Sequence, residues 1–154
     1  MSERTKKFST ELDALITRGD ALWMAIQYEC QPKEFKAQVT EAFKGDKDKI
    51  EKYFKSLPNF KNDYQAWYTE AQAVIKQVMP DRLADFISYF DVPKGRKDIT
   101  FQNYMIRDYL QGLAITRGWE KEVVVNGSAA IPEFVQQLNM VKAAKATLES
   151  SLMD

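Results

Sequence analysis

The amino-acid sequence predicts an all-α fold in which residues 1–154 form one compact bundle of about six or seven helices. Apolar residues recur at spacings of three and four along most of the chain, which is the period of one face of an α-helix. Proline and glycine interrupt this pattern at intervals that suit separate helices. The one extended run, Val123 to Val125, has no evident partner strand, so it predicts an extended loop or a minimal hairpin near 119–128 rather than a sheet.

The first helix begins after a cap at Ser9 or Thr10 and ends near Cys30. Pro32 sets this end because proline disfavours helical backbone in the residue before it, and the same proline suits the first turn of a second helix. Within the first helix, Gly19 belongs to an Arg-Gly-Asp tripeptide known from cell adhesion. Its position in the middle of a helix predicts close packing of a neighbouring helix instead.

Three further helices follow in the middle of the chain. Gly45 ends the second helix, and Asp46 opens a short third helix that Pro58 closes. The strongest amphipathic pattern covers about 62–79, where aromatic and aliphatic residues share one face. A fifth helix covers about 81–90.

Beyond a turn at 92–98, two helices complete the predicted bundle. Thr100 is a suitable N-cap for a helix that reaches Leu113, and apolar residues on two of its sides predict a central position. The last helix, 132–154, has no glycine or proline to stop it. Its spacing predicts a coiled-coil-like seam that contacts a second copy, another protein or a domain beyond Asp154. The seam consists of Phe134, Leu138, Val141, Leu148 and Leu152.

Composition argues against several classes of function. The chain has 22 Lys plus Arg against 22 Asp plus Glu, and this balance argues against sequence-independent binding to phosphate backbones. The absence of histidine removes Ser-His-Asp and Cys-His catalysis and the usual zinc sites, so we expect no catalytic residue, metal or cofactor. Cys30 is the single cysteine, and Met1 to Phe8 lacks the apolar core of a signal peptide. We expect a cytoplasmic protein without a membrane segment.

The densest basic cluster, Lys94, Arg96 and Lys97, lies in a predicted exposed turn. Three cations in four residues suit contact with a phosphate backbone, and single-stranded bases stack on aromatic rings like the many between Tyr53 and Trp119. The helical spacing of these rings, on faces that also carry aliphatic residues, predicts instead that they belong to the core. Acidic residues flank the cluster on both sides and cancel much of its field. Binding of nucleic acid is therefore the alternative, and contact with protein is the first interpretation.

Arg107 and Asp108 are the best polar pair in the predicted central helix. Pairs of this kind mostly hold helices in register, so we expect a structural ion pair. An enzyme without histidine, built on these two side chains, is the remaining alternative, because the sequence does not exclude a carboxylate-based site.

Part of the chain resembles a known group of proteins. Three stretches of sequence carry the resemblance: LPNF at 57–60, YQAWYTEAQAVIKQVMPDRLADF from Tyr64, and PKGRKDITFQNYMIRDYLQGL up to Leu113. It is similar to the N-terminal region of longer, poorly characterised bacterial proteins whose second half resembles HEPN-type helical domains. In that superfamily a C-terminal Arg and His cleave RNA, and many members serve phage defence or toxin and antitoxin systems. Because this chain has no histidine, the resemblance implies a non-catalytic, regulatory portion whose last helix leads into the second half.

Overall fold

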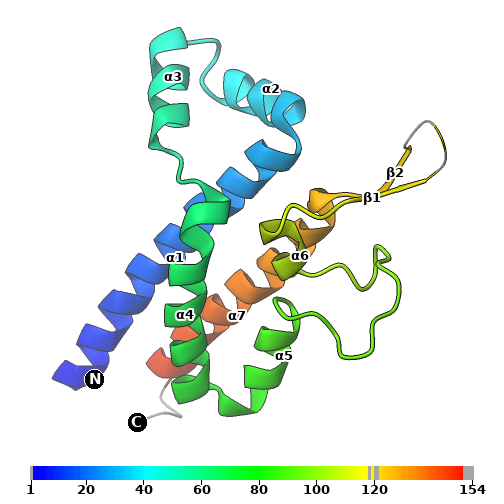
Figure 1. Ribbon diagram of the computed structural model, residues 1–154. Coiled ribbons are helices and arrows are strands. Elements are labelled where there is room, and N and C mark those ends of the chain that lie inside the picture. Colours follow the sequence, from blue (N-terminus) through cyan, green and yellow to red (C-terminus); the bar gives the residue numbers. More distant parts are fainter. Residues whose placement is uncertain (1, 118, 120–121, 151–154) are drawn as a thin grey trace.

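Three long helices form the centre of the structure, a computed structural model that describes residues 2–117, 119 and 122–150. They are α1 (Glu3–Cys30), α4 (Phe60–Val78) and α7 (Ile131–Glu149). Each packs against the other two (Figure 1). The all-α prediction is confirmed, with seven α-helices in the described part of the chain.

Four shorter helices extend from this centre. Two of them project together beyond the C-terminal end of α1, at the top of Figure 1. The other two belong to the segment that returns from α4 to α7. Their bounds are α2 Pro32–Ala42, α3 Lys47–Ser56, α5 Leu83–Ser88 and α6 Ile106–Leu110, with 3-10 turns at Pro80–Arg82 and Gly127–Ala130.

The first helix starts earlier than its sequence predicts. Ser2, not Ser9 or Thr10, is the N-cap of α1, and its side chain accepts a hydrogen bond from the backbone N–H of Thr5. Ser9 is buried inside the helix, where its hydroxyl donates to Glu149 of α7 at 3.0 Å. Serine and threonine are common N-cap residues, which is why the sequence predicted a cap at Ser9 or Thr10. The same residues also occur inside helices, where the hydroxyl forms a hydrogen bond with another group.

The predicted helix from Thr100 to Leu113 is wrong, because only Ile106–Leu110 is helical. Thr100 and Asn103 bond to each other through reciprocal backbone and side-chain contacts of 2.7 and 3.3 Å, which close a separate turn. Helix α6 then begins after Met105, which has an extended backbone. The backbone N–H of Met105 donates to the Asp108 carboxylate at 2.8 Å. The contacts of Thr100 with Asn103 and of Met105 with Asp108 therefore divide the predicted helix into a turn and a short helix.

A small antiparallel hairpin projects from the helices beside α6 (Figure 1). Its strands are β1 (Ile115–Arg117) and β2 (Glu122–Val125), so it begins before the predicted 119–128 region. Ile115 pairs with Val125 but Thr116 pairs with Val123, and this shift of register is a bulge in β2. After β2, Asn126 caps the 3-10 turn Gly127–Ala130, which leads into α7.

Trp67 is at the centre of the core, where α1, α4 and α7 meet. It is fully buried, its Nε1 donates to the carbonyl of Leu15 at 2.9 Å, and its ring lies 5.0 Å from that of Phe134. Gly19 of α1 packs directly on this ring and on Leu138 of α7. The prediction that Gly19 permits close helix packing is confirmed.

A buried polar chain joins α4, α7 and α5. The Tyr64 hydroxyl donates to Oε1 of Gln137 at 2.6 Å, and Nε2 of Gln137 donates to the carbonyl of Phe86 at 2.9 Å. All three residues have no exposed surface. These hydrogen bonds fix the register of the three helices. They also leave no buried donor of the Tyr64 and Gln137 side chains without an acceptor.

None of the helices in the described ranges combines the length and the apolar character that crossing a membrane requires.

Replacing Gly19 by alanine tests the close approach of the central helices. A Cβ at this position would lie 2.5 Å from Cδ1 of Leu138 and 3.1 Å from Nε1 of Trp67. We expect Gly19→Ala to lower the free energy of unfolding by about 1–3 kcal/mol, although alanine favours a helix over glycine. Urea unfolding measures this change, with Thr17→Ala on the exposed side of α1 as the control. A stabilised Gly19→Ala variant would contradict the packing described above.

Candidate functional site

The predicted contact seam of the last helix lies inside the protein. Phe134, Leu138 and Val141 are buried in the core against α1 and α4, and Leu148 is partly buried against it. Leu152 lies outside the described residues. The prediction that this seam contacts another protein is corrected, because its side chains already contact their own chain. An apolar stripe has the same spacing whether its partner is internal or external.

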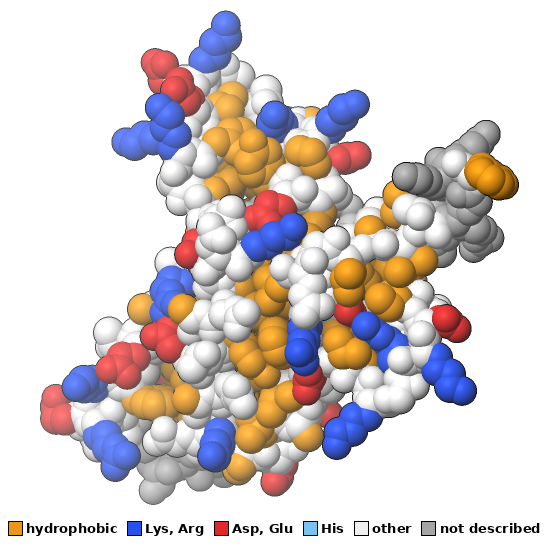
Figure 2. Space-filling model, viewed as in Figure 1, with side chains coloured by type: hydrophobic (Ala, Val, Ile, Leu, Met, Phe, Trp, Pro, Cys, Tyr) orange, Lys and Arg blue, Asp and Glu red, His pale blue; other side chains and the backbone are white. Residues whose placement is uncertain are grey.

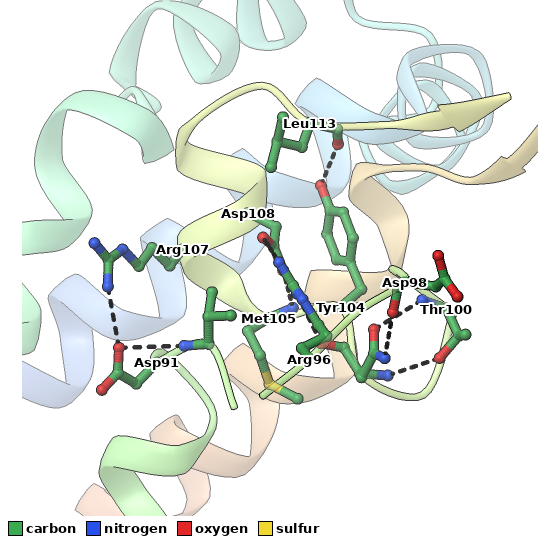
Figure 3. A network of polar contacts seen from close by, with 11 residues as sticks. Asp91, Arg96, Asp98, Thr100, Tyr104, Met105, Arg107, Asp108 and Leu113 are labelled. Carbon is green, nitrogen blue, oxygen red and sulfur yellow. Dashed lines mark hydrogen bonds and ion pairs between the residues drawn. The ribbon is translucent and has the colours of Figure 1, made fainter. Parts of the chain in front are cut away.

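The basic cluster does not present three cations to solvent. Lys94 and Lys97 are exposed, but Arg96 turns inward and forms a two-pronged ion pair with Asp108, at 2.6 and 2.9 Å (Figure 3). Nη1 of Arg96 also donates to the carbonyl of Asn103 at 3.1 Å. The Arg96 side chain is only 11% exposed. Two of the three candidate nucleic-acid contacts therefore remain on the surface, and the third is a structural residue.

Arg107 and Asp108 do not form the predicted ion pair with each other. Arg107 lies on the exposed side of α6 and contacts Asp91 at 3.2 Å, whereas Asp108 points inward to Arg96 (Figure 3). Adjacent residues of a helix point in different directions, so side chains at i and i+1 do not face each other. The prediction is corrected: each residue has its partner in the preceding loop.

Asp108 is the anchor of the long segment between α5 and the hairpin. Burial raises the pKa of its carboxyl, but the bonds from Arg96 and from the N–H of Met105, with the charge of Arg107, hold the pKa below its ordinary value. Both carboxylate oxygens are occupied by these donors. The arrangement holds the loop in place and leaves no lone carboxylate for acid or base chemistry, so the alternative of an enzyme built on this pair has no support.

A second polar cluster lies where the end of α1 meets the start of α4. Glu29 accepts hydrogen bonds from the Tyr109 hydroxyl at 2.6 Å and from the N–H of Phe60 at 2.7 Å. Beside it, a cavity of about 560 Å³ is bordered by Cys30, Tyr109 and Lys61. Burial is the main cause that raises the pKa of the Cys30 thiol and of the Tyr109 hydroxyl. Both groups stay protonated at neutral pH and are not activated nucleophiles.

Glu133, in the first turn of α7, is partly buried, and one oxygen of its carboxyl has no partner in the described part of the chain. Its Oε2 is shielded from solvent and has no hydrogen-bond partner among the described residues. Burial raises its pKa to about 8, and the charge of Asp108 contributes. Its charge in turn contributes to the raised pKa of Tyr104 and Tyr64, for both of which burial is the main cause. No group of three or more His, Cys, Asp or Glu side chains in the described ranges is placed to hold a metal.

The exposed apolar segment is the feature that the sequence did not reveal. We use this name for Phe101, Leu113, Trp119 and Val123, whose exposed fractions are 57%, 38%, 102% and 52%. They are the large apolar side chains that stay exposed among the described residues, and all lie between 101 and 123. Figure 2 shows hydrophobic atoms at the end of the hairpin projection. The helical spacing of the aromatic residues predicted that they belong to the core, and this is wrong for Phe101 and Trp119. The run Val123 to Val125 was the one feature of the sequence that indicated a non-helical segment here.

An apolar groove runs beside the base of the hairpin. Trp23 of α1, Phe101, and Ile131 and Val135 of α7 line it, and its volume is about 500 Å³. Ser128, three residues after the end of β2, also borders the groove. The remaining lining residues are uncharged, with glutamine side chains and Pro132 completing the wall.

Removing Asp108 tests whether the loop depends on its buried ion pair. We expect Asp108→Ala to lower the free energy of unfolding by about 3 kcal/mol or more, because Arg96 would remain as an unpaired, largely buried cation. The matched control is Asp91→Ala, which removes the exposed pair with Arg107, whose side chains are 53% and 49% exposed. We expect about 1 kcal/mol or less for this control. Equal losses in urea unfolding would contradict the assignment.

The pH dependence of stability tests the burial of Glu133. A glutamate in the unfolded chain ionises near pH 4.5, whereas Glu133 in the folded chain ionises at about pH 8. Between these values the folded state holds a proton that the unfolded state has released, so stability falls as pH rises. We expect Glu133→Gln to remove this decline between about pH 5 and 8, as followed by thermal unfolding. The exposed control Glu41→Gln should keep it.

Comparisons with known proteins give no relative. The chain matches no protein-family model, no curated protein and no solved structure.

Proposed function

We propose that this chain is a non-catalytic interaction module that binds another protein chain through the exposed apolar segment. The observation that carries the proposal is Trp119, which is 102% exposed in the connection between two strands that project from the helical centre. Three further large apolar side chains of the same segment are exposed with it. These side chains lie in one stretch of the sequence, between 101 and 123, and large exposed apolar surface is typical of a contact site.

Contact with protein suits the chemistry of these side chains. Burying apolar surface stabilises a complex by about 25 cal/mol per Å², and a tryptophan ring buries roughly 150–250 Å². Tryptophan is accordingly enriched among the residues that dominate binding energy at protein interfaces. The groove beside the hairpin adds further apolar surface, lined in part by Phe101.

The electrostatics favour protein over nucleic acid. The chain carries no net charge, and Arg96, the central cation of the basic cluster, is engaged by Asp108. Lys94 and Lys97 remain exposed next to Asp91 and Asp98. A surface that neutralises many phosphates needs more cations than this.

The chemistry of the buried polar groups supports a role in binding rather than catalysis. Asp108 and Glu29 are occupied by structural hydrogen bonds, and Cys30 is a protonated thiol. The resemblance to the N-terminal region of HEPN-associated bacterial proteins supports the same role. On that basis the module regulates a phage-defence or toxin and antitoxin protein, in the cytoplasm.

Site-specific photo-crosslinking tests the proposal. Benzoylphenylalanine in place of Trp119 should form a covalent adduct with a protein chain when cells that naturally contain the protein are irradiated. The control is the same residue in place of Thr69, which is exposed on α4. We expect protein adducts from position 119 and none from position 69, detected by gel shift and mass spectrometry. Adducts with nucleic acid, or no adduct at position 119, would refute the proposal.

A further inference from the structure

We infer that Asn126 is a site of spontaneous deamidation, and that the isoaspartate formed there loosens the base of the hairpin from α6. The inference goes beyond the proposed function, because it concerns a chemical change in the chain itself and needs no partner. Asn126 lies between β2 and the 3-10 turn Gly127–Ala130, and it is exposed, so water reaches the reacting group. The next residue is glycine, whose backbone nitrogen no side chain crowds.

The reaction needs only Asn126, Gly127 and water. The backbone nitrogen of Gly127 adds to Cγ of Asn126, the Cγ–Nδ2 bond breaks, and ammonia leaves with the proton of the Gly127 N–H. The product is a cyclic succinimide, and water then opens the ring at either of its carbonyl groups. Opening at the side-chain carbonyl gives aspartate. Opening at the main-chain carbonyl gives isoaspartate, whose backbone runs through Cβ and Cγ and is longer by a methylene group.

Hydrogen bonds at the Asn126 side chain favour the addition step. Its Oδ1 accepts from the backbone N–H of Ser128 at 2.9 Å and also from the Ser128 hydroxyl. Negative charge develops on this oxygen when the Gly127 nitrogen adds to Cγ. Donors that already point at such an oxygen stabilise the charge as it forms. The contacts that make Asn126 the cap of the 3-10 turn therefore also activate its amide carbonyl.

The fold requires glycine at the attacking position. A Cβ on residue 127 would lie 2.4 Å from Cδ1 of Tyr109 and 3.5 Å from Sγ of Cys30. A larger residue would crowd the attacking nitrogen and so protect Asn126, but it does not fit against the Tyr109 ring. The packing of the 3-10 turn on α6 thus keeps the reactive Asn-Gly pair in place.

Asn59 provides an internal comparison. It is the N-cap of α4, and its Oδ1 accepts from the backbone N–H of Asn62 at 3.0 Å. The residue that follows it is Phe60, which is fully buried. Asn59 and Asn126 therefore share the capping hydrogen bond and differ in the residue that supplies the attacking nitrogen.

Isoaspartate at position 126 alters the contact between the hairpin and α6. Gly127 meets the ring of Tyr109, and the Tyr109 hydroxyl donates to Glu29 at 2.6 Å. A methylene group inserted into the backbone before Gly127 displaces it from this close fit, because a packed interior has no space to absorb the shift. Val125, the last residue of β2, is buried directly beside this point. Chains with isoaspartate therefore lose packing where the hairpin joins the helices.

Ageing of the purified, folded chain tests the reaction. The chain is incubated at physiological temperature and mildly alkaline pH. Peptide mapping with electron-transfer fragmentation, which distinguishes isoaspartate from aspartate, then follows each asparagine. We expect Asn126 to convert at least about tenfold faster than Asn59, since only Asn126 precedes glycine. Equal rates at the two positions would overturn the inference. So would an Asn126 that stays intact in the folded chain while it converts in urea, because the cap would then protect it.

Thermal unfolding of the converted chains tests the loosening. Anion exchange isolates them, because conversion adds a negative charge to a chain whose net charge is zero. We expect the fraction rich in isoaspartate to unfold roughly 2–4 °C below the fresh chain, the shift that loss of a cap of this size produces. Hydrogen exchange of the 3-10 turn should become faster in the same fraction.

Two variants are the matched controls. Asn126→Ser keeps a capping residue but cannot deamidate, so its unfolding midpoint should not change with ageing. Asn126→Asp carries the charge of one product on an unaltered backbone, and it should unfold with the fresh chain. The inferred loosening is overturned if the isoaspartate fraction keeps the original midpoint. It is also overturned if Asn126→Asp unfolds as early as that fraction, because charge and not backbone length would then be the cause.

Discussion

The packing of Trp67 against Gly19 and Phe134 is the contact on which the rest of the structure depends. It holds α1, α4 and α7 together at their crossing, and the bond from its indole N–H to Leu15 leaves no buried donor unpaired. The Tyr64 and Gln137 chain then adds α5 to the same centre. Phe134, Leu138 and Val141 of α7 are buried in this core, so these three side chains are not available for contact with another molecule.

A second anchor decides what the remaining surface can present. Arg96 and Asp108 hold the segment between α5 and the hairpin with both carboxylate oxygens engaged. This ion pair turns the central cation of the basic cluster inward and leaves Phe101 outside, 57% exposed. One buried interaction thereby weakens the case for phosphate binding and strengthens the case for an apolar contact.

The polar and the apolar groups of the described residues differ in how far they are engaged within the fold. Asp108 and Glu29 accept hydrogen bonds from neighbouring segments, and burial keeps the Cys30 thiol and the Tyr109 hydroxyl protonated. The large apolar side chains that stay exposed among the described residues lie between 101 and 123, and an apolar groove lies beside the base of the hairpin.

The sequence by itself determined the fold class, the ends of most helices and the packing role of Gly19, because helical period and proline or glycine positions are local properties. It also determined which catalytic classes the lack of histidine removes. Only the tertiary structure decided that the seam at Phe134, Leu138 and Val141 is internal and that Asp108 pairs with Arg96 instead of Arg107. These are choices of partner between segments distant in the chain or on different faces of a helix, and residue spacing does not specify them. The exposure of Trp119 was also decided by the tertiary structure, because the identity of an aromatic residue does not show whether it lies in a core or on a surface.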